Sequence, residues 1–189
     1  MSDVIKIDKL DAARRQLDCA IELWFLDKDE LSSHTLAAAA YQLVHDLKEN
    51  RGLDKELLYD TAMIKDKYRK KWIAAVKKPG NFLKHADNDP DGTLEFDPLK
   101  SIALMMGAAA GLRLLGVRTS DAVYALTFWL VVHKPTWITP HFLKLYEDRI
   151  GIDNLKEFKL IPKSDFLQVY LRSGDTARQI AAEAGIPLR

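Results

Sequence analysis

Apolar residues recur every three or four positions along most of the chain, and this spacing predicts a protein built of helices. Leu10, Ala13, Leu17 and Trp24 show the pattern at the start of the chain. Strand-like alternation is confined to residues 4–7. We therefore expect an all-α fold, a compact multi-helix bundle built on an antiparallel N-terminal helical hairpin.

Capping and stop residues predict where the helices of this bundle begin and end. Asp8 is the expected N-cap of a first helix over residues 8–26, and Ser32 or Ser33 that of a second helix ending at Asn50 before Gly52. A third helical pattern starts at Lys55, and Pro79–Gly80 is expected to interrupt it. Further helices are expected over residues 99–115, 121–133 (capped by Thr119 or Ser120), 139–149, 164–171 and 175–184.

The length and apolar content favour a single helical domain over residues 1–189. With 189 residues, of which 48% are hydrophobic, the chain can bury a sizeable core. The alternative division is a core over residues 8–134 with a C-terminal helical extension over 135–189. The apolar run over residues 122–132 predicts the most buried helix.

Charge, cysteine content and apolar run length limit the classes of function and location. The 28 Lys and Arg balance 27 Asp and Glu, so binding to nucleic acid needs a local basic patch. The single Cys19 excludes an intrachain disulfide and fits a reducing compartment. The longest apolar run is shorter than the roughly 20 residues that span a bilayer. The start has no secretory pattern, so we expect a cytoplasmic protein without membrane partners.

A basic stretch between residues 65 and 78 is the one candidate patch. It contains Lys65, Lys67, Arg69, Lys70, Lys71, Lys77 and Lys78 against a single acid, Asp66. Such a row could follow a phosphate backbone. The alternative is a solvated helix face opposite an apolar one.

Alternating carboxylates at Asp87, Asp89 and Asp91, followed by Gly92, resemble the first half of a calcium loop. The twelfth position, where a bidentate glutamate normally completes the ion's shell, is Pro98. Because of the carboxylates in the first half of this loop, calcium is the one candidate cofactor. The alternative is an exposed turn, which favours the same residue types.

Asn81 and His85 are the candidate catalytic residues, because a spacing of four places two side chains on one helix face. Together with Asp87 they fall at a predicted junction between a helix and a loop. Histidine also titrates near neutral pH and is the commonest general acid or base.

The residues just described, together with an alanine-rich helix over 36–44, resemble the HEPN family of small helical bundles across residues 8–115. Active members of that family share an Arg-Asn-x-x-x-His motif that cleaves RNA. Asn81 and His85 match this motif, but Gly80 stands where the motif has its arginine. Lys77 and Lys78 are the nearest cations, and a cation is needed to stabilise charge on a scissile phosphate. The stretch is also similar to that of uncharacterised bacterial proteins of this length.

Three functions remain open from the sequence. The leading hypothesis is a non-enzymatic, bacterial, HEPN-like interaction module that forms a homodimer and contacts nucleic acid or protein. The second is an enzyme that cleaves RNA or acts on nucleotides around Asn81 and His85. The third is a metal-binding module that uses the loop from Asp87 to Asp91.

Overall fold

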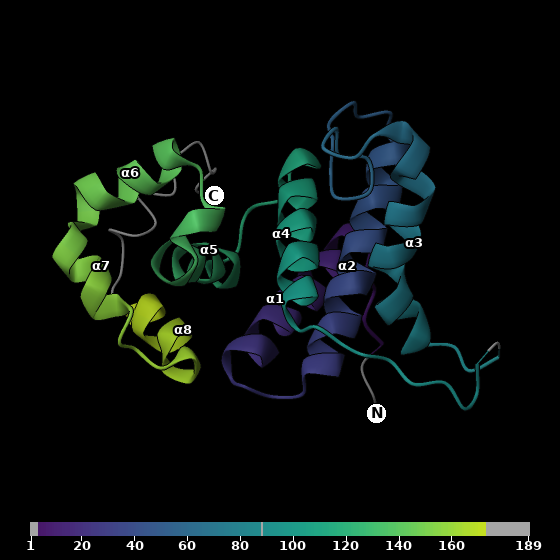
Figure 1. Cartoon of the computed structure of the whole chain (residues 1–189), viewed down its shortest axis with the longest axis horizontal. Helices are drawn as coiled ribbons and strands as arrows, with labels where there is room; N and C mark the ends of the chain where they lie inside the picture. Colours follow the sequence, from purple (N-terminus) through teal and green to yellow (C-terminus); the bar gives the residue numbers. More distant parts are fainter. Residues whose placement is uncertain (1–3, 88, 173–189) are drawn as a thin grey trace. The chain divides into compact units, whose positions relative to one another are not determined.

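The computed structural model describes residues 4–87 and 89–172, and this part of the chain is all-helical, without a strand. Helical spacing therefore predicted the fold class correctly. The bounds of the elements, labelled in Figure 1, are α1 (Lys9–Phe25), α2 (Glu30–Asn50), α3 (Asp66–Phe82), α4 (Leu99–Leu114), α5 (Asp121–His133), the short 3-10 helix η1 (Pro135–Trp137), α6 (Pro140–Ile150), α7 (Ile152–Phe158) and α8 (Lys163–Arg172). The helix expected over residues 175–184 lies outside the described residues.

The chain divides into two compact units. The first contains the described residues up to Ala20 together with Asp29–Val117, and the second contains Ile21–Lys28 and the described residues from Arg118 onward. Helix α1 thus contributes to both units. The single domain expected over residues 1–189 stays a prediction.

In the first unit, α2 packs against α4 and α3 (Figure 1). Small residues at the crossing of α2 and α4 bring the two backbones close together. A Cβ atom at Gly107 would lie 2.8 Å from Cε2 of Tyr41, and one at Gly111 would overlap Cγ1 of Val44. The two glycines therefore allow a close crossing of α2 and α4. Ser33 ties α2 to α1, because its hydroxyl donates to the carbonyl oxygen of Ala20 at 2.9 Å.

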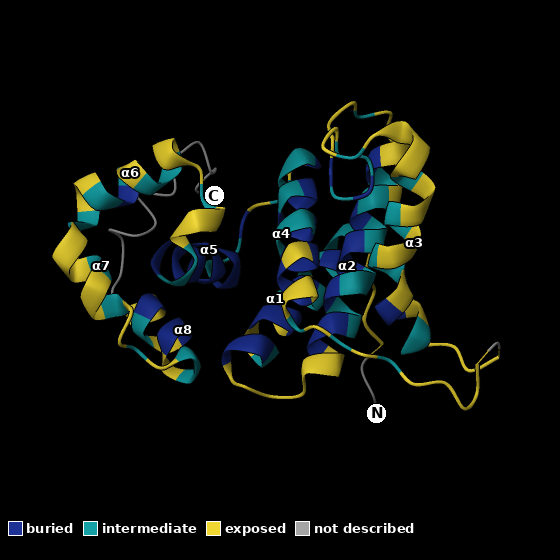
Figure 2. Cartoon of the chain, viewed as in Figure 1, coloured by how far each residue is buried: buried dark blue, intermediate teal, exposed yellow. Residues whose placement is uncertain are grey.

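In the second unit, α5 is buried along nearly its whole length, as Figure 2 shows. Aromatic contacts surround it: the rings of Trp129 and Trp24 meet edge to face at 4.8 Å, and Phe128 packs against Tyr146 and Phe166. The end of α1 and helices α6 and α8 therefore bury apolar surface around α5. Among the described residues, no helix is both long and apolar enough to cross a membrane.

Several helix ends fall where the sequence predicts them, and others do not. Asp8 accepts from the N–H of Asp11, and Ser120 accepts from that of Val123, so both act as expected N-caps. The expected cap of α2 was wrong, because Asp29 caps it and Ser33 is buried inside the helix. The sequence analysis predicted no helix over the residues of α7.

The third predicted helix was wrong at both ends, since α3 begins at Asp66 and continues through Pro79 to Phe82. Proline lacks the N–H that a helix interior uses, which normally ends or kinks the helix. Here Pro79 and Gly80 are both buried, and a Cβ at Gly80 would lie 3.2 Å from Cβ of Ala38 on α2. Packing against α2 offsets the missing hydrogen bond.

Candidate functional site

A surface pocket of about 520 Å³ lies at the C-terminal end of α3. Its lining residues come from the last turn of α3 and from the loop that follows. They are Lys78, Asn81, Phe82, His85, Asp87 and Asp89. The two candidate catalytic residues and two of the three candidate calcium ligands thus line one pocket, and Asp91 is not among the lining residues.

The end of α3 sets the positions of Asn81 and His85. The carbonyl oxygen of Asn81 accepts the N–H of Lys84 at 3.1 Å and that of His85 at 3.0 Å. These bonds close the final turn and keep His85 one turn beyond Asn81, although His85 itself lies past the helix. His85 therefore does not lie on a face of α3, although both side chains line the pocket.

A tight turn sets the position of Asp89. The N–H of Gly92 donates to the carbonyl oxygen of Asp89 at 2.8 Å. A Cβ at Gly92 would lie 3.0 Å from that oxygen and 3.1 Å from Oδ2 of the Asp89 side chain. The missing side chain of Gly92 therefore leaves room for the carboxylate.

The polar side chains of the pocket have no partners inside the described part of the protein. None of Lys78, Asn81, His85, Asp87 and Asp89 forms a side-chain hydrogen bond or an ion pair there. Their donors and acceptors are therefore open to a ligand. Phe82 adds a half-buried aromatic ring to the same wall.

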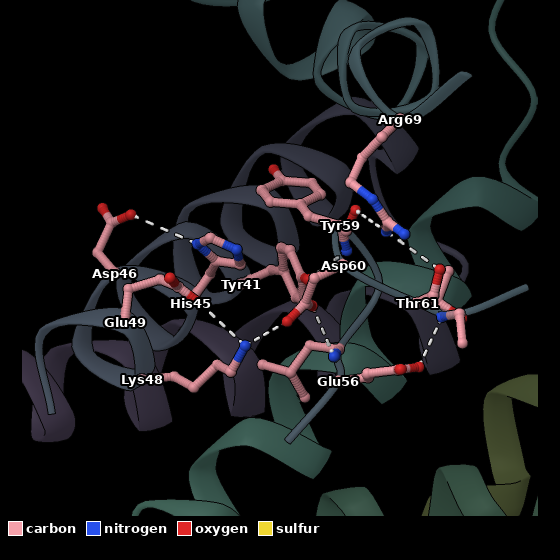
Figure 3. Close-up of polar contacts among 12 residues, drawn as sticks. Tyr41, His45, Asp46, Lys48, Glu49, Glu56, Tyr59, Asp60, Thr61 and Arg69 are labelled. Carbon is pink, nitrogen blue, oxygen red and sulfur yellow. Dashed lines mark hydrogen bonds and ion pairs between the residues drawn. The ribbon is translucent and has the colours of Figure 1, made fainter. Parts of the chain in front are cut away.

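A second polar cluster, shown in Figure 3, has the opposite character because its side chains bind one another. Lys48 is only 4% exposed, and its ammonium donates to Asp60 and, at 2.9 Å, to Glu49. Asp60 also accepts the N–H of Leu57 at 2.7 Å. Burial alone would raise the pKa of Asp60, but the Lys48 ammonium and the Leu57 N–H hold it below its ordinary value. This cluster fixes the loop before α3.

That loop is not helical, because its backbone N–H and C=O groups form hydrogen bonds with side chains. The N–H of Tyr59 donates to the hydroxyl of Tyr41 at 3.0 Å, and the N–H of Ala62 donates to Glu56 at 2.6 Å. The Arg69 guanidinium donates to the carbonyl oxygens of Thr61 and Ile64 at 3.1 and 3.0 Å. These partners replace the hydrogen bonds of the helix expected from Lys55.

The cations of the basic stretch differ in their contacts with the rest of the first unit. Arg69 is committed to the loop and to Asp66, and the ammonium of Lys77 lies 4.9 Å from the centre of the Tyr59 ring. Lys67, Lys71 and Lys78 are exposed and follow one face of α3 at helical spacing, with the ammonium of Lys67 4.9 Å from the centre of the neighbouring Tyr68 ring. Asn81 continues the same face. The row of lysines, about 16 Å long at 1.5 Å per residue, therefore leads into the pocket.

The remaining histidines do not join this site. His34 is completely buried, and its Nδ1 lies 3.0 Å from the Ser101 hydroxyl. His45 packs against Tyr41 and Tyr59, and His133 stacks on Trp129. The surroundings of these three indicate structural roles, and His141 is exposed on α6.

The described residues contain no group of three His, Cys, Asp or Glu side chains placed to hold a metal ion. Asp87 and Asp89 share the pocket, whereas Asp91 does not line it. Calcium binding by these three residues stays a prediction.

Another cavity, of about 150 Å³, lies beside the apolar residues of α3. It is lined by Leu58, Trp72, Ala75, Val76, Lys100, Ala103 and Leu104. Its lining is almost wholly apolar, with Lys100 as the single charged residue. It therefore offers little for acid–base chemistry.

Comparison with known proteins gives no match among family models, curated sequences or solved structures.

Proposed function

We propose that the protein is a non-catalytic, HEPN-like module that binds single-stranded RNA along the exposed face of α3. The single observation behind this proposal is that Lys67, Lys71 and Lys78 follow the same helix face as Asn81 and end at the pocket. Lysines in such a row can neutralise successive phosphates of a strand. The cytoplasmic location and the homodimer expected from the sequence belong to the same proposal.

The pocket supports this proposal because its residue types suit one nucleotide. A lysine binds phosphate, an aromatic ring stacks on a base, and amides and carboxylates pair with base edges. Lys78, Phe82, Asn81 and Asp87 supply these groups within one pocket of about 520 Å³. Pockets of this size hold small ligands.

RNA cleavage is the second candidate, and one observation favours it. Lys78 lines the pocket with Asn81 and His85, so a cation is present although Gly80 replaces the arginine of the resembled motif. We place cleavage second because His85 is exposed, and within the described residues no side chain orients its imidazole. A general acid or base needs such positioning.

The experiment measures binding of a labelled single-stranded RNA by fluorescence anisotropy and its integrity on a gel. We expect wild-type protein to bind without cleaving, and Lys71→Glu with Lys78→Glu to weaken binding by about tenfold or more. Lys144→Glu with Lys159→Glu makes the same charge change at two exposed lysines of the second unit and is the matched control.

Two results would contradict the proposal. Equal losses in the control and in the α3 variants would mean that net charge, not this face, governs binding. Cleavage by wild-type protein that disappears in both His85→Ala and Asn81→Ala would establish the second candidate instead.

A further inference from the structure

We propose that the pocket accepts an unpaired base that carries an exocyclic amino group and discriminates against uracil. This inference rests on the proposed function, because it names the base that the pocket receives from the bound strand. It starts from the chemistry of the lining: two carboxylates, Asp87 and Asp89, face the same pocket as the single ammonium of Lys78.

The carboxylates determine which base edge fits. A carboxylate accepts hydrogen bonds and donates none, and the described residues leave both Asp87 and Asp89 without partners. An amino group, as on cytosine, adenine or guanine, supplies the donor that they need. At the position of the cytosine amino group uracil carries the carbonyl oxygen O4, so an acceptor would face a carboxylate there, and N3–H is the one donor left on that edge.

The same charges orient the nucleotide in the pocket. Phosphate is repelled by Asp87 and Asp89 and attracted by Lys78, the member of the lysine row that lines the pocket. The phosphate therefore lies toward α3, and the base points toward the loop. Phe82, between Asn81 and the loop in sequence, provides the ring for stacking.

Gly92 is a positioning residue for this recognition. Its N–H holds the carbonyl of Asp89, and an added Cβ would lie 3.1 Å from the Asp89 carboxylate. A methyl group at position 92 would push the carboxylate from its place. Gly92→Ala should therefore reduce the preference among bases without removing a lysine from the row.

The experiment compares decamers of cytidine and of uridine, which have the same backbone charge, at pH 7.5 by fluorescence anisotropy. We expect wild-type protein to bind the cytidine decamer about fivefold more tightly or better, the discrimination that a good pair of hydrogen bonds gives. Asp87→Asn with Asp89→Asn should reduce the ratio of the two dissociation constants to below about twofold, because an amide can also donate to uracil. Asp91→Asn removes one charge from the same loop outside the pocket lining and should keep the ratio.

The outcomes separate this inference from the proposed function. Equal binding of the two decamers, with the loss in the α3 lysine variants retained, would overturn the base preference and leave RNA binding in place. A preference that survives in the double Asp variant would also overturn it. Failure of wild-type protein to bind either decamer would overturn the proposed function, and this inference with it.

Discussion

His34 is a titratable group placed entirely inside the first unit. Its side chain is 0% exposed, its ring meets that of Phe96 edge to face at 5.0 Å, and its Nε2 has no hydrogen-bond partner in the described structure. Burial, with a smaller contribution from the charge of Lys100, lowers the pKa of His34 to about 4. The imidazole is therefore neutral at physiological pH.

This burial makes stability depend on pH between about 4 and 6.5. In that range the unfolded chain takes up a proton at His34 that the folded chain does not, so the free energy of unfolding falls as pH falls. We expect a loss of about 3 kcal/mol from this group by pH 4, measured by urea unfolding at a series of pH values. His34→Gln should reduce the dependence, to which His133 still contributes because burial lowers its pKa too, whereas His141→Gln, at an exposed histidine, should leave the dependence unchanged.

Asp60 acts in a different pH window. Its pKa lies below the ordinary value of about 3.9, so its contribution to stability is complete above that value and is lost as pH falls further. The two groups can therefore be separated by titration. A dependence that is identical in wild type and His34→Gln between pH 4 and 6.5 would contradict the assignment to His34.

At the scale of elements, the crossing of α2 and α4 depends on the missing side chain of Gly111. Helix propensity alone would favour alanine there by up to about 1 kcal/mol. The new Cβ would overlap Val44 and lie 3.1 Å from Cδ1 of Leu57, however. We expect Gly111→Ala to lower the free energy of unfolding by about 1–3 kcal/mol, measured by urea denaturation.

The matched test combines Gly111→Ala with Val44→Ala. Removing the Val44 methyl groups relieves the overlap, so the double variant should lose less stability than the sum of the two single variants. Strict additivity would show that the close approach of these two residues does not determine the crossing.

Helix α3 holds the preceding loop through Arg69 and Trp72. The guanidinium of Arg69 donates to the carbonyl oxygens of Thr61 and Ile64, and Nε1 of Trp72 donates to that of Leu58 at 2.7 Å. A lysine has one compact ammonium in place of the planar fork. Arg69→Lys should therefore destabilise the protein by about 1–2 kcal/mol and increase amide exchange in the loop.

The control for this change is Arg51→Lys, at an exposed arginine just after α2. It should alter the unfolding free energy by less than about 0.5 kcal/mol. Unchanged amide exchange in Arg69→Lys would contradict a role for the guanidinium in fixing the loop.

At the scale of the whole molecule, the net charge of +1 means that RNA binding depends on where the lysines lie. Three lysines on one face predict a slope of about −2 for the logarithm of the association constant against the logarithm of salt concentration, at about 0.7 per phosphate contact on a single strand. Removing Lys71 should reduce the magnitude of the slope by about 0.7, and removing Lys144 should not change it. A slope near zero would exclude phosphate contacts as the source of binding.

Helix α3 was the element whose bounds the sequence predicted least well. Hydrogen bonds of the preceding loop with Tyr41 and Arg69 set its late start. Packing against Ala38 lets the helix continue through Pro79. Tyr41 and Arg69 lie 18 and 8 residues from the loop groups that they bind. No local pattern encodes these contacts.

The candidate site was predictable in part. The spacing of Asn81 and His85, and the position of Asp87 just beyond them, place these residues together at the end of a helix, and all three line the pocket. The sequence analysis interpreted the acidic loop as a separate metal-binding site, and it did not identify Phe82 as a residue of the candidate site. The helical spacing of Lys67, Lys71 and Lys78 was the available signal that this row belongs with the pocket.

The sequence by itself determined that the chain is helical and where most helices lie, because apolar spacing and capping are local properties read over a few turns. It also determined the buried character of α5, whose residues are apolar on every side. Only the tertiary structure decided which charges are used internally, as in Lys48 with Asp60 and Arg69 with the loop, and which stay free at the pocket. The physical reason is that a hydrogen bond or ion pair depends on distances between groups far apart in the chain, and only folding sets those distances.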